Sequence, residues 1–484
     1  MDNAEIKRRT LSGFIWKFSE KIGVQIIQFF LQIVLARLLL PEDYGVVAII
    51  TVLISIADVF VEGGFGQALI QKKHTDDLDY SSIFWLNIGV SCVLYVVLFC
   101  LSPLIAEFYH LPQLKNMVRL QGLILIISAF NIVQKNLIQR ELKFKIVFRF
   151  SLAGVAVQGL VGIICALNGL GAWSLIISYI CNYIVVTAII WITVKWRPKA
   201  MFSGHRVKSL FAFGSKLLGV SLFNTLYNNV YNLIIGRVYS ADSLGYYNRG
   251  QSIPYLLYNN INITINGVSF PMFSQYQDDM EQIKNLTRRC TKTLFFVVAP
   301  LLVGVVGTAP SIVSILLTEK WNPCIPFMQL MSISYLTMAL QSVSGQAMLA
   351  IGESGAYMKM EIVKKVISIV LIIGAIPFGV YTMVGVSILS GIAGVGINVF
   401  YSKRLLGYRG SELARDILPT VGAASIMGGV VYVMNGLSLN VYALLVVQVV
   451  IGMIVYILAS FGLKNESLYY LFTIIRRKIA PSEN

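Results

Sequence analysis

Apolar runs of roughly twenty residues recur along the whole chain and are separated by short polar gaps. A helix of about twenty apolar residues spans the hydrocarbon core of a bilayer, so each run predicts one transmembrane helix. About fourteen such runs can be counted, and the seventh and eighth are the most polar. They begin near Phe14, Tyr44, Ser82, Met117, Val147, Ala172, Leu210, Gly245, Leu294, Ile325, Ile362, Thr382, Ile417 and Val441. The pattern therefore predicts an all-α integral membrane protein.

Four of the predicted helices carry a polar stripe, with polar residues spaced so that they project from one helix face. The stripes on the first and second helices are Lys17, Lys21, Gln25, Gln28 and Gln32, then Thr51, Ser55, Asp58 and Glu62. Those on the seventh and eighth are Lys216, Asn224, Asn228 and Tyr231, then Asn248, Ser252, Tyr255, Asn259, Asn262 and Asn266, with Arg249 beside the outer end. Lipid cannot solvate such groups, so we expect the four stripes to line a water-filled central chamber. The alternative is that they only hydrogen-bond neighbouring helices together.

The charged residues of the stripes each allow two interpretations. The ammonium groups of Lys17, Lys21 and Lys216 could together hold a phosphate or pyrophosphate, or each could extend to the membrane surface. Asp58 and Glu62 are candidates for coupling transport to an ion, and a Lys21–Glu62 ion pair is the structural alternative. Arg249 is expected to face an outer vestibule, where it could meet a sugar acid.

Composition and charge agree with this topology. The chain has 484 residues, of which 56% are hydrophobic and 13% charged, and its mean hydropathy is +0.73. The net charge of +16 comes mainly from Lys and Arg in alternate gaps, including Lys135 and the group Lys284–Lys292. By the positive-inside rule both termini are cytoplasmic, and a nucleic-acid-binding face is not indicated. The first residues run into a segment too long for a signal-peptide core, so they should be retained.

A repeat divides the chain. Arg37–Gly45 matches Arg237–Gly245 at an offset of two hundred residues, with an Arg, an acidic residue and a Gly in the same order. Six helices separate the two copies, which predicts a parallel repeat of two lobes. We expect an N-lobe at 1–200, a C-lobe at 201–407, and an extra helix pair with a cytoplasmic tail at 408–484.

The motifs of several function classes are missing from the sequence. It contains no GxxxxGK[ST] phosphate-binding loop, no HExxH and no GxSxG, and its six Cys show no CxxC spacing. The gaps expected outside the membrane are short, which leaves no room for a catalytic domain there. We therefore expect transport without covalent chemistry, with no catalytic residue, no metal and no cofactor.

Two hairpins carry a family resemblance. The runs Gln28–Gly45, Leu226–Gly236 and Leu244–Tyr247 resemble those of Wzx-type polysaccharide flippases, WzxC-like in particular, which belong to the multidrug/oligosaccharidyl-lipid/polysaccharide (MOP) exporter superfamily. The resemblance covers essentially the whole chain. It implies a MOP/MATE-like fold of two six-helix lobes and an extra pair in a bacterial inner membrane. It also implies an undecaprenyl-pyrophosphate-linked oligosaccharide as substrate, moved from the cytoplasmic to the outer leaflet.

These observations lead to one hypothesis and two alternatives. The hypothesis is alternating access, in which the lysines take the pyrophosphate and the Asn, Gln and Tyr faces hydrogen-bond the sugars. Its partners would be the lipid-linked oligosaccharide, membrane lipid, and a polysaccharide polymerase with chain-length or export proteins. The alternatives are a drug/cation antiporter of the same superfamily and a membrane scaffold for a glycan-assembly complex that transports nothing.

Overall fold

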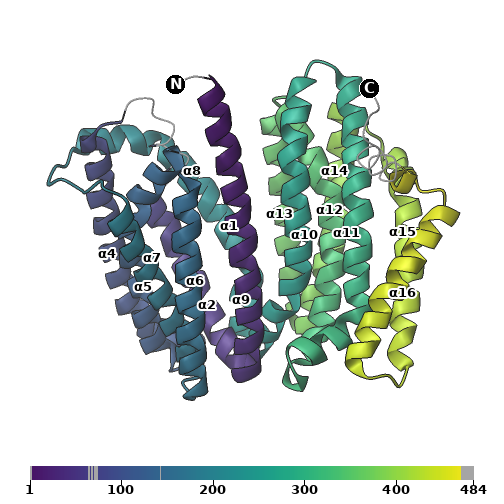
Figure 1. Ribbon diagram of the computed structural model, residues 1–484, viewed down its shortest axis with the longest axis horizontal. Helices are drawn as coiled ribbons and strands as arrows, with labels where there is room; N and C mark the ends of the chain where they lie inside the picture. The colour runs from purple at the N-terminus through teal and green to yellow at the C-terminus, as the bar shows by residue number, and fades with distance from the viewer. Residues whose placement is uncertain (1–2, 64–65, 67–68, 70–74, 142, 470–484) are drawn as a thin grey trace. The chain divides into compact units, whose positions relative to one another are not determined.

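The computed structural model describes residues 3–63, 66, 69, 75–141 and 143–469, with the backbone alone for 3–20, 209, 210, 212, 213 and 216. The chain divides into two compact units, Met1–Gly245 and Tyr246–Asn484. Figure 1 shows that both are bundles of long helices. The lobe limits expected from the sequence, at 200 and 407, remain a prediction.

The first unit contains eight helices and the first turn of a ninth within the described residues. They are α1 (Asn3–Leu38), α2 (Pro41–Glu62), α4 (Asp77–Phe108), α5 (Leu114–Arg140), α6 (Phe144–Leu167), α7 (Ala172–Thr193), α8 (Gly204–Asn228), α9 (Val230–Val238) and the start of α10 (Ala241–Gln275). Local signals fix their ends. Pro41 opens α2, where its missing N–H costs nothing. Asp76 caps α4 by accepting a hydrogen bond from the backbone N–H of Asp79 over 2.9 Å.

The second unit is built around one long helix. It comprises the rest of α10, then α11 (Met280–Leu316), α12 (Cys324–Ala350), α13 (Ser354–Ala375), α14 (Val380–Leu406), α15 (Gly410–Val433) and α16 (Val441–Gly462). Helix α11 packs against α12, α15 and α16. At 37 residues it is about 55 Å long, well beyond the ~30 Å hydrocarbon core. The basic group Lys284–Lys292, expected in a loop, therefore lies in the first turns of this helix.

The chain is a multi-pass membrane protein. Ten helices in the described part of the chain are long and apolar enough to cross a membrane. Helices α8, α10, α12 and α13 fall outside this group, because amide, hydroxyl or charged side chains interrupt their apolar sequences. The all-α class is thus confirmed, whereas the number of fourteen spans is not.

The repeated hairpins occupy the same register in the structure. Helix α1 ends at Leu38 and α2 begins at Pro41, and two hundred residues later α9 ends at Val238 and α10 begins at Ala241. The two hairpins also pack on each other within the first unit. A Cβ placed on Gly45 would lie 1.8 Å from the carbonyl oxygen of Ala241, and one on Gly245 would lie 2.0 Å from that of Pro41. The two glycines of the repeat therefore allow one close, reciprocal crossing of α2 and α10.

Candidate functional site: a polar cavity in the first unit

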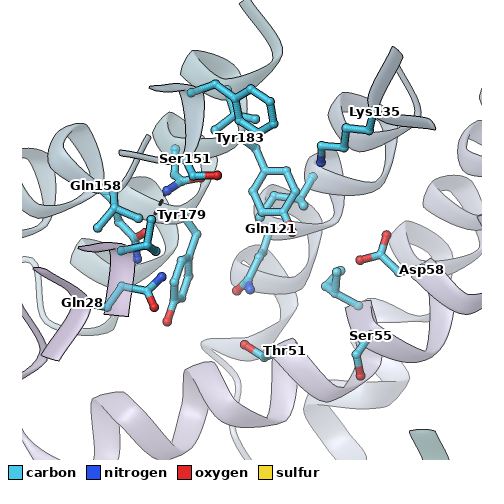
Figure 2. Close-up of a pocket in the computed structure, with 17 residues that line it drawn as sticks. Gln28, Thr51, Ser55, Asp58, Gln121, Lys135, Ser151, Gln158, Tyr179 and Tyr183 are labelled. Carbon is cyan, nitrogen blue, oxygen red and sulfur yellow. Dashed lines mark hydrogen bonds between the residues drawn. The ribbon is translucent and has the colours of Figure 1, made fainter. Parts of the chain in front are cut away.

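A cavity of about 540 Å³ lies among α1, α2, α5, α6 and α7. Figure 2 shows polar side chains from these helices converging on it. The polar or ionisable lining residues are Gln28, Thr51, Ser55, Asp58, Gln121, Lys135, Ser151, Gln158, Tyr179, Asn182 and Tyr183. Its volume falls within the range of pockets that bind small molecules. A cavity of this polarity, inside a bundle of membrane helices, can hold water or the polar part of a ligand.

Two of the predicted stripes contribute to this cavity. Gln28 comes from the stripe on α1, and Thr51, Ser55 and Asp58 from the stripe on α2. Their spacing turns them to the same side of α2, and the helices that close the cavity opposite them are α5, α6 and α7. The hydroxyl of Thr51 donates to the carbonyl of Val47 over 2.8 Å, which leaves its oxygen lone pairs to face the cavity.

Helix α5 supplies a further polar face that the sequence reasoning missed. Gln121 and Lys135 line the cavity, and Ser128 and Asn131 lie between them at helical spacing. Gln121 is only 3% exposed, and its Oε1 atom has no hydrogen-bond partner among the described residues. The steps of seven, three and four residues from Gln121 to Lys135 were visible in the sequence. They show the same helical spacing as the other stripes.

Lys135 is the main correction at this site. From the sequence, Lys135 was expected in a cytoplasmic gap, but α5 continues to Arg140, so Lys135 belongs to the helix and faces the cavity. Its ammonium group lies within electrostatic range of Asp58 and Glu62. Within the described residues no direct ion pair joins Lys135 to either carboxylate. A separated cation and carboxylate in one cavity can each bind a charged or hydrogen-bonding group of a ligand.

Helices α6 and α7 close the cavity. Gly154 on α6 lies so near α7 that an added Cβ would meet Asn182 at 3.3 Å. The Asn182 amide donates to Gln158 Oε1 over 3.0 Å and holds both amides at the wall. Tyr179 and Tyr183 line the same wall from α7 (Figure 2). The wall thus combines aromatic rings with amides, the side chains that can contact a sugar ring and its hydroxyls.

The other residues of the first two stripes whose side chains the structure describes do not line this cavity. Lys21 and Gln32 on α1 are exposed, Gln25 is half-buried, and Glu62 is exposed at the end of α2. No ion pair joins Lys21 to Glu62, both of which the structure describes, so that alternative is not supported. The side chains of Lys17 and Lys216 lie outside the described residues.

The seventh stripe is divided between two helices. Asn224 and Asn228 belong to α8, and Tyr231 to α9, which begins after a break at Asn229. At this break the side-chain amide of Asn229, which is not part of the stripe, donates to the carbonyl of Thr225 over 2.9 Å. None of the residues of α8 and α9 whose side chains the structure describes lines the 540 Å³ cavity.

The stripe on α10 belongs to the second unit. Ser252 donates to the carbonyl of Arg249 over 2.8 Å, Tyr255 is 50% exposed beside Tyr335, Asn259 is half-buried, and Asn262 accepts from Asn266 over 3.0 Å. Arg249 is only 8% exposed, and its guanidinium carbon lies 5.9 Å from the centre of the Trp321 ring. It is therefore packed inside the unit, and its expected contact with a sugar acid remains a prediction. The joint chamber of all four stripes also remains a prediction.

Comparison with known proteins places the chain in a family. A family profile described as "Polysaccharide biosynthesis protein" matches residues 34–326. The lipopolysaccharide biosynthesis protein WzxC of Escherichia coli K12 is 26% identical over 71% of this chain and 70% of its own length. The teichuronic acid biosynthesis protein TuaB of Bacillus subtilis 168 is 26% identical over 72% of this chain and 73% of its own length.

Solved structures show the same fold. The lipid II flippase MurJ, in an inward closed conformation, matches 95% of this chain and 100% of its own with a TM-score of 0.76 and 17% identity. An inward-facing multidrug resistance MATE family transporter of the MOP superfamily matches 79% of this chain and 95% of its own with a TM-score of 0.60 and 13% identity. The fold is thus that of MOP transporters, and because the family profile covers more than half of the sequence, the chain belongs to the polysaccharide biosynthesis protein family.

Proposed function

We propose that this chain flips an undecaprenyl-pyrophosphate-linked oligosaccharide from the cytoplasmic to the outer leaflet of a bacterial inner membrane by alternating access. The relatives support this: WzxC and TuaB are named for polysaccharide biosynthesis, and a third, ExoT of Rhizobium meliloti 1021, is named a succinoglycan biosynthesis transport protein. The observation that carries the proposal is the polar cavity within membrane helices, because a flippase must solvate sugar hydroxyls on their way across lipid.

The residues of the cavity fit a carbohydrate. Sugar hydroxyls both donate and accept hydrogen bonds, and the Gln and Asn side chains at the wall offer both functions. Gln121 matters most, because its buried Oε1 atom has no protein partner in the described structure. A buried acceptor without a partner costs about 1–3 kcal/mol, and a ligand hydroxyl or water would recover that cost.

Charged groups have separate roles in the proposal. Lys17, Lys21 and Lys216 take the pyrophosphate near the cytoplasmic side, where the positive-inside rule also places both termini. Asp58, with Glu62 and Lys135 nearby, couples transport to an ion by changing its charge between the two states of the transporter. No covalent step is required, and a polysaccharide polymerase would use the delivered repeat unit.

Reconstitution tests this proposal directly. Purified protein is placed in liposomes with a fluorescent lipid-linked oligosaccharide, and the accessibility of the sugar to an external lectin is followed with time. The wild type is expected to move the sugar across the bilayer, and Gln121→Leu to slow this at least tenfold. Gln139→Leu is the matched control, because Gln139 is an exposed amide on the same helix.

Three outcomes are informative. Liposomes with wild-type protein that move the sugar no faster than empty liposomes would refute the proposal and favour the scaffold. Movement of ethidium but not of the sugar would favour the drug antiporter. Equal rates for Gln121→Leu and Gln139→Leu would leave flipping intact but remove the cavity from the substrate path.

A further inference from the structure

A second cavity, of about 420 Å³, lies in the second unit near the start of α11. Its walls are Asn285, Arg288, Arg289, Lys292 and Thr293 from α11, with Glu466 and Ser467 from the segment after α16. Three cationic side chains on less than two turns of one helix therefore face a single space. This space has no part in the proposed path of the substrate.

Two of these cations hold the helices together. The guanidinium of Arg288 donates two hydrogen bonds of 2.8 Å to the two carboxylate oxygens of Asp416 on α15. Lys292 lies 3.0 Å from Asp416 and 2.7 Å from Glu466. The side chain of Asp416 is only 2% exposed, whereas that of Glu466 is 80% exposed. Asp416 is thus a fixed structural partner, and Glu466 is an exposed carboxylate that an incoming anion could replace.

The cavity lies at the height of the membrane surface. The apolar part of α11, from Leu294 to Leu316, is about 23 residues and about 35 Å long, enough to fill the hydrocarbon core. Arg288, Arg289 and Lys292 precede Leu294 by two to six residues, about half a turn to just under two turns, which corresponds to the headgroup layer. A basic pocket between helices at this level is the arrangement that binds anionic lipid headgroups.

The segment that supplies Glu466 and Ser467 also carries exposed apolar side chains. Phe461, Leu463 and Tyr469 are each more than 40% exposed, and the rings of Phe461 and Tyr469 contact edge to face at 5.8 Å. Asn465 anchors this segment by donating to Thr420 over 2.8 Å. Exposed aromatic and aliphatic side chains this close in the chain to Glu466 could receive acyl chains while the cations hold the headgroup.

We propose that this cavity binds the phosphate group of an anionic membrane lipid, with Arg289 and Lys292 as its cationic contacts and Glu466 as the carboxylate that it displaces. The bound lipid joins α11 to the end of α16. The site acts independently of the substrate cavity in the first unit.

Native mass spectrometry of the detergent-purified protein tests the proposal. Phosphatidylglycerol and phosphatidylcholine are added at equal concentration, and retention of each lipid is measured. The wild type is expected to retain phosphatidylglycerol at least fivefold better. Arg289→Gln should lose most of this preference and Arg289→Lys should keep it. Arg404→Gln, which removes an exposed cation at the end of α14, should change nothing. Thermal unfolding of each variant shows that it is folded.

Glu466 gives a test of opposite sign. Glu466→Gln is expected to raise phosphatidylglycerol retention two- to fivefold, and Glu353→Gln, the same charge change at an exposed position before α13, should not. Equal retention of the two lipids by the wild type, or equal effects of Arg289→Gln and Arg404→Gln, would overturn the proposal. Displacement of the lipid by 10 mM inorganic phosphate would show a site for soluble anions and would also overturn it.

Discussion

The crossing of α2 and α10 provides the sharpest prediction about structure. A Cβ on Gly45 would lie 1.8 Å from the carbonyl oxygen of Ala241, whereas an ordinary carbon–oxygen contact is about 3.3 Å. The obstacle is backbone, so no side-chain rotation can relieve it, and the helices must separate by about 1.5 Å. The same holds for Gly245 against Pro41, where the distance is 2.0 Å.

The expected cost follows from this geometry. Overpacking lowers the free energy of unfolding by about 1–3 kcal/mol, and because the obstacle here is backbone, we expect a value near 3 kcal/mol. Ala favours the helix over Gly by about 1 kcal/mol, which offsets part of this loss. Gly45→Ala should therefore lower the free energy of unfolding by about 2 kcal/mol. For a unit of this size that corresponds to a melting temperature lowered by roughly 4–8 °C. Gly89→Ala, where nothing lies within 4 Å, should raise it instead.

Thermal unfolding in detergent measures these changes, and the double variant adds a second criterion. Gly45 and Gly245 allow the same crossing, so once one Cβ has separated the helices, the other costs less. The double variant should therefore lose clearly less stability than the sum of the single variants. If Gly45→Ala is as stable as Gly89→Ala, or if the single effects simply add, the reciprocal crossing is not present.

Three further predictions concern single side chains. Lys21→Ala should abolish polysaccharide export in cells while membrane insertion stays normal, and normal export would refute its role. Gln121→Leu should raise the melting temperature by removing a buried acceptor that costs about 1–3 kcal/mol, even as flipping slows; a fall in stability would show that the amide is structural. Arg288→Gln should lower the free energy of unfolding by about 1.5–3 kcal/mol, because the buried Asp416 loses two hydrogen bonds but keeps Lys292, whereas Lys143→Gln at an exposed ion pair should cost less than about 1 kcal/mol. Unfolding curves of the two variants that coincide would refute the difference.

The helices and the hairpin repeat could be predicted from the sequence because they depend on local properties. Apolar runs give the helices, and Pro41 and Gly45 mark an element boundary that recurs at Ala241 and Gly245. Helix length was less predictable, since a helix does not have to end where the membrane does. Lys135 and Arg288 were expected in loops for that reason, and both lie in helices.

The candidate site could be predicted only in part. Periodicity places Thr51, Ser55 and Asp58 on one face, but it does not reveal which helices close the space in front of them. Nor does it separate residues that line a cavity from residues that join helices. Gln448 is an example of the second kind, because it donates to the carbonyl of Val431 and to Asn435 and accepts from Ser311. A polar side chain that lines a cavity and one that joins two helices can have the same spacing in the sequence, and only the three-dimensional structure tells them apart.

Cysteine accessibility in the membrane tests the central claim, that the polar faces of α1 and α2 border water inside the bilayer. In a variant without the six native cysteines, Cys is introduced at Gln28 or, as a control, at Phe30, an apolar side chain of α1 that is 63% exposed. A charged, water-soluble thiol reagent should modify Gln28→Cys rapidly, and the lipid-linked oligosaccharide should slow the reaction. If Gln28→Cys is as unreactive as Phe30→Cys, the cavity is dry and the account is contradicted.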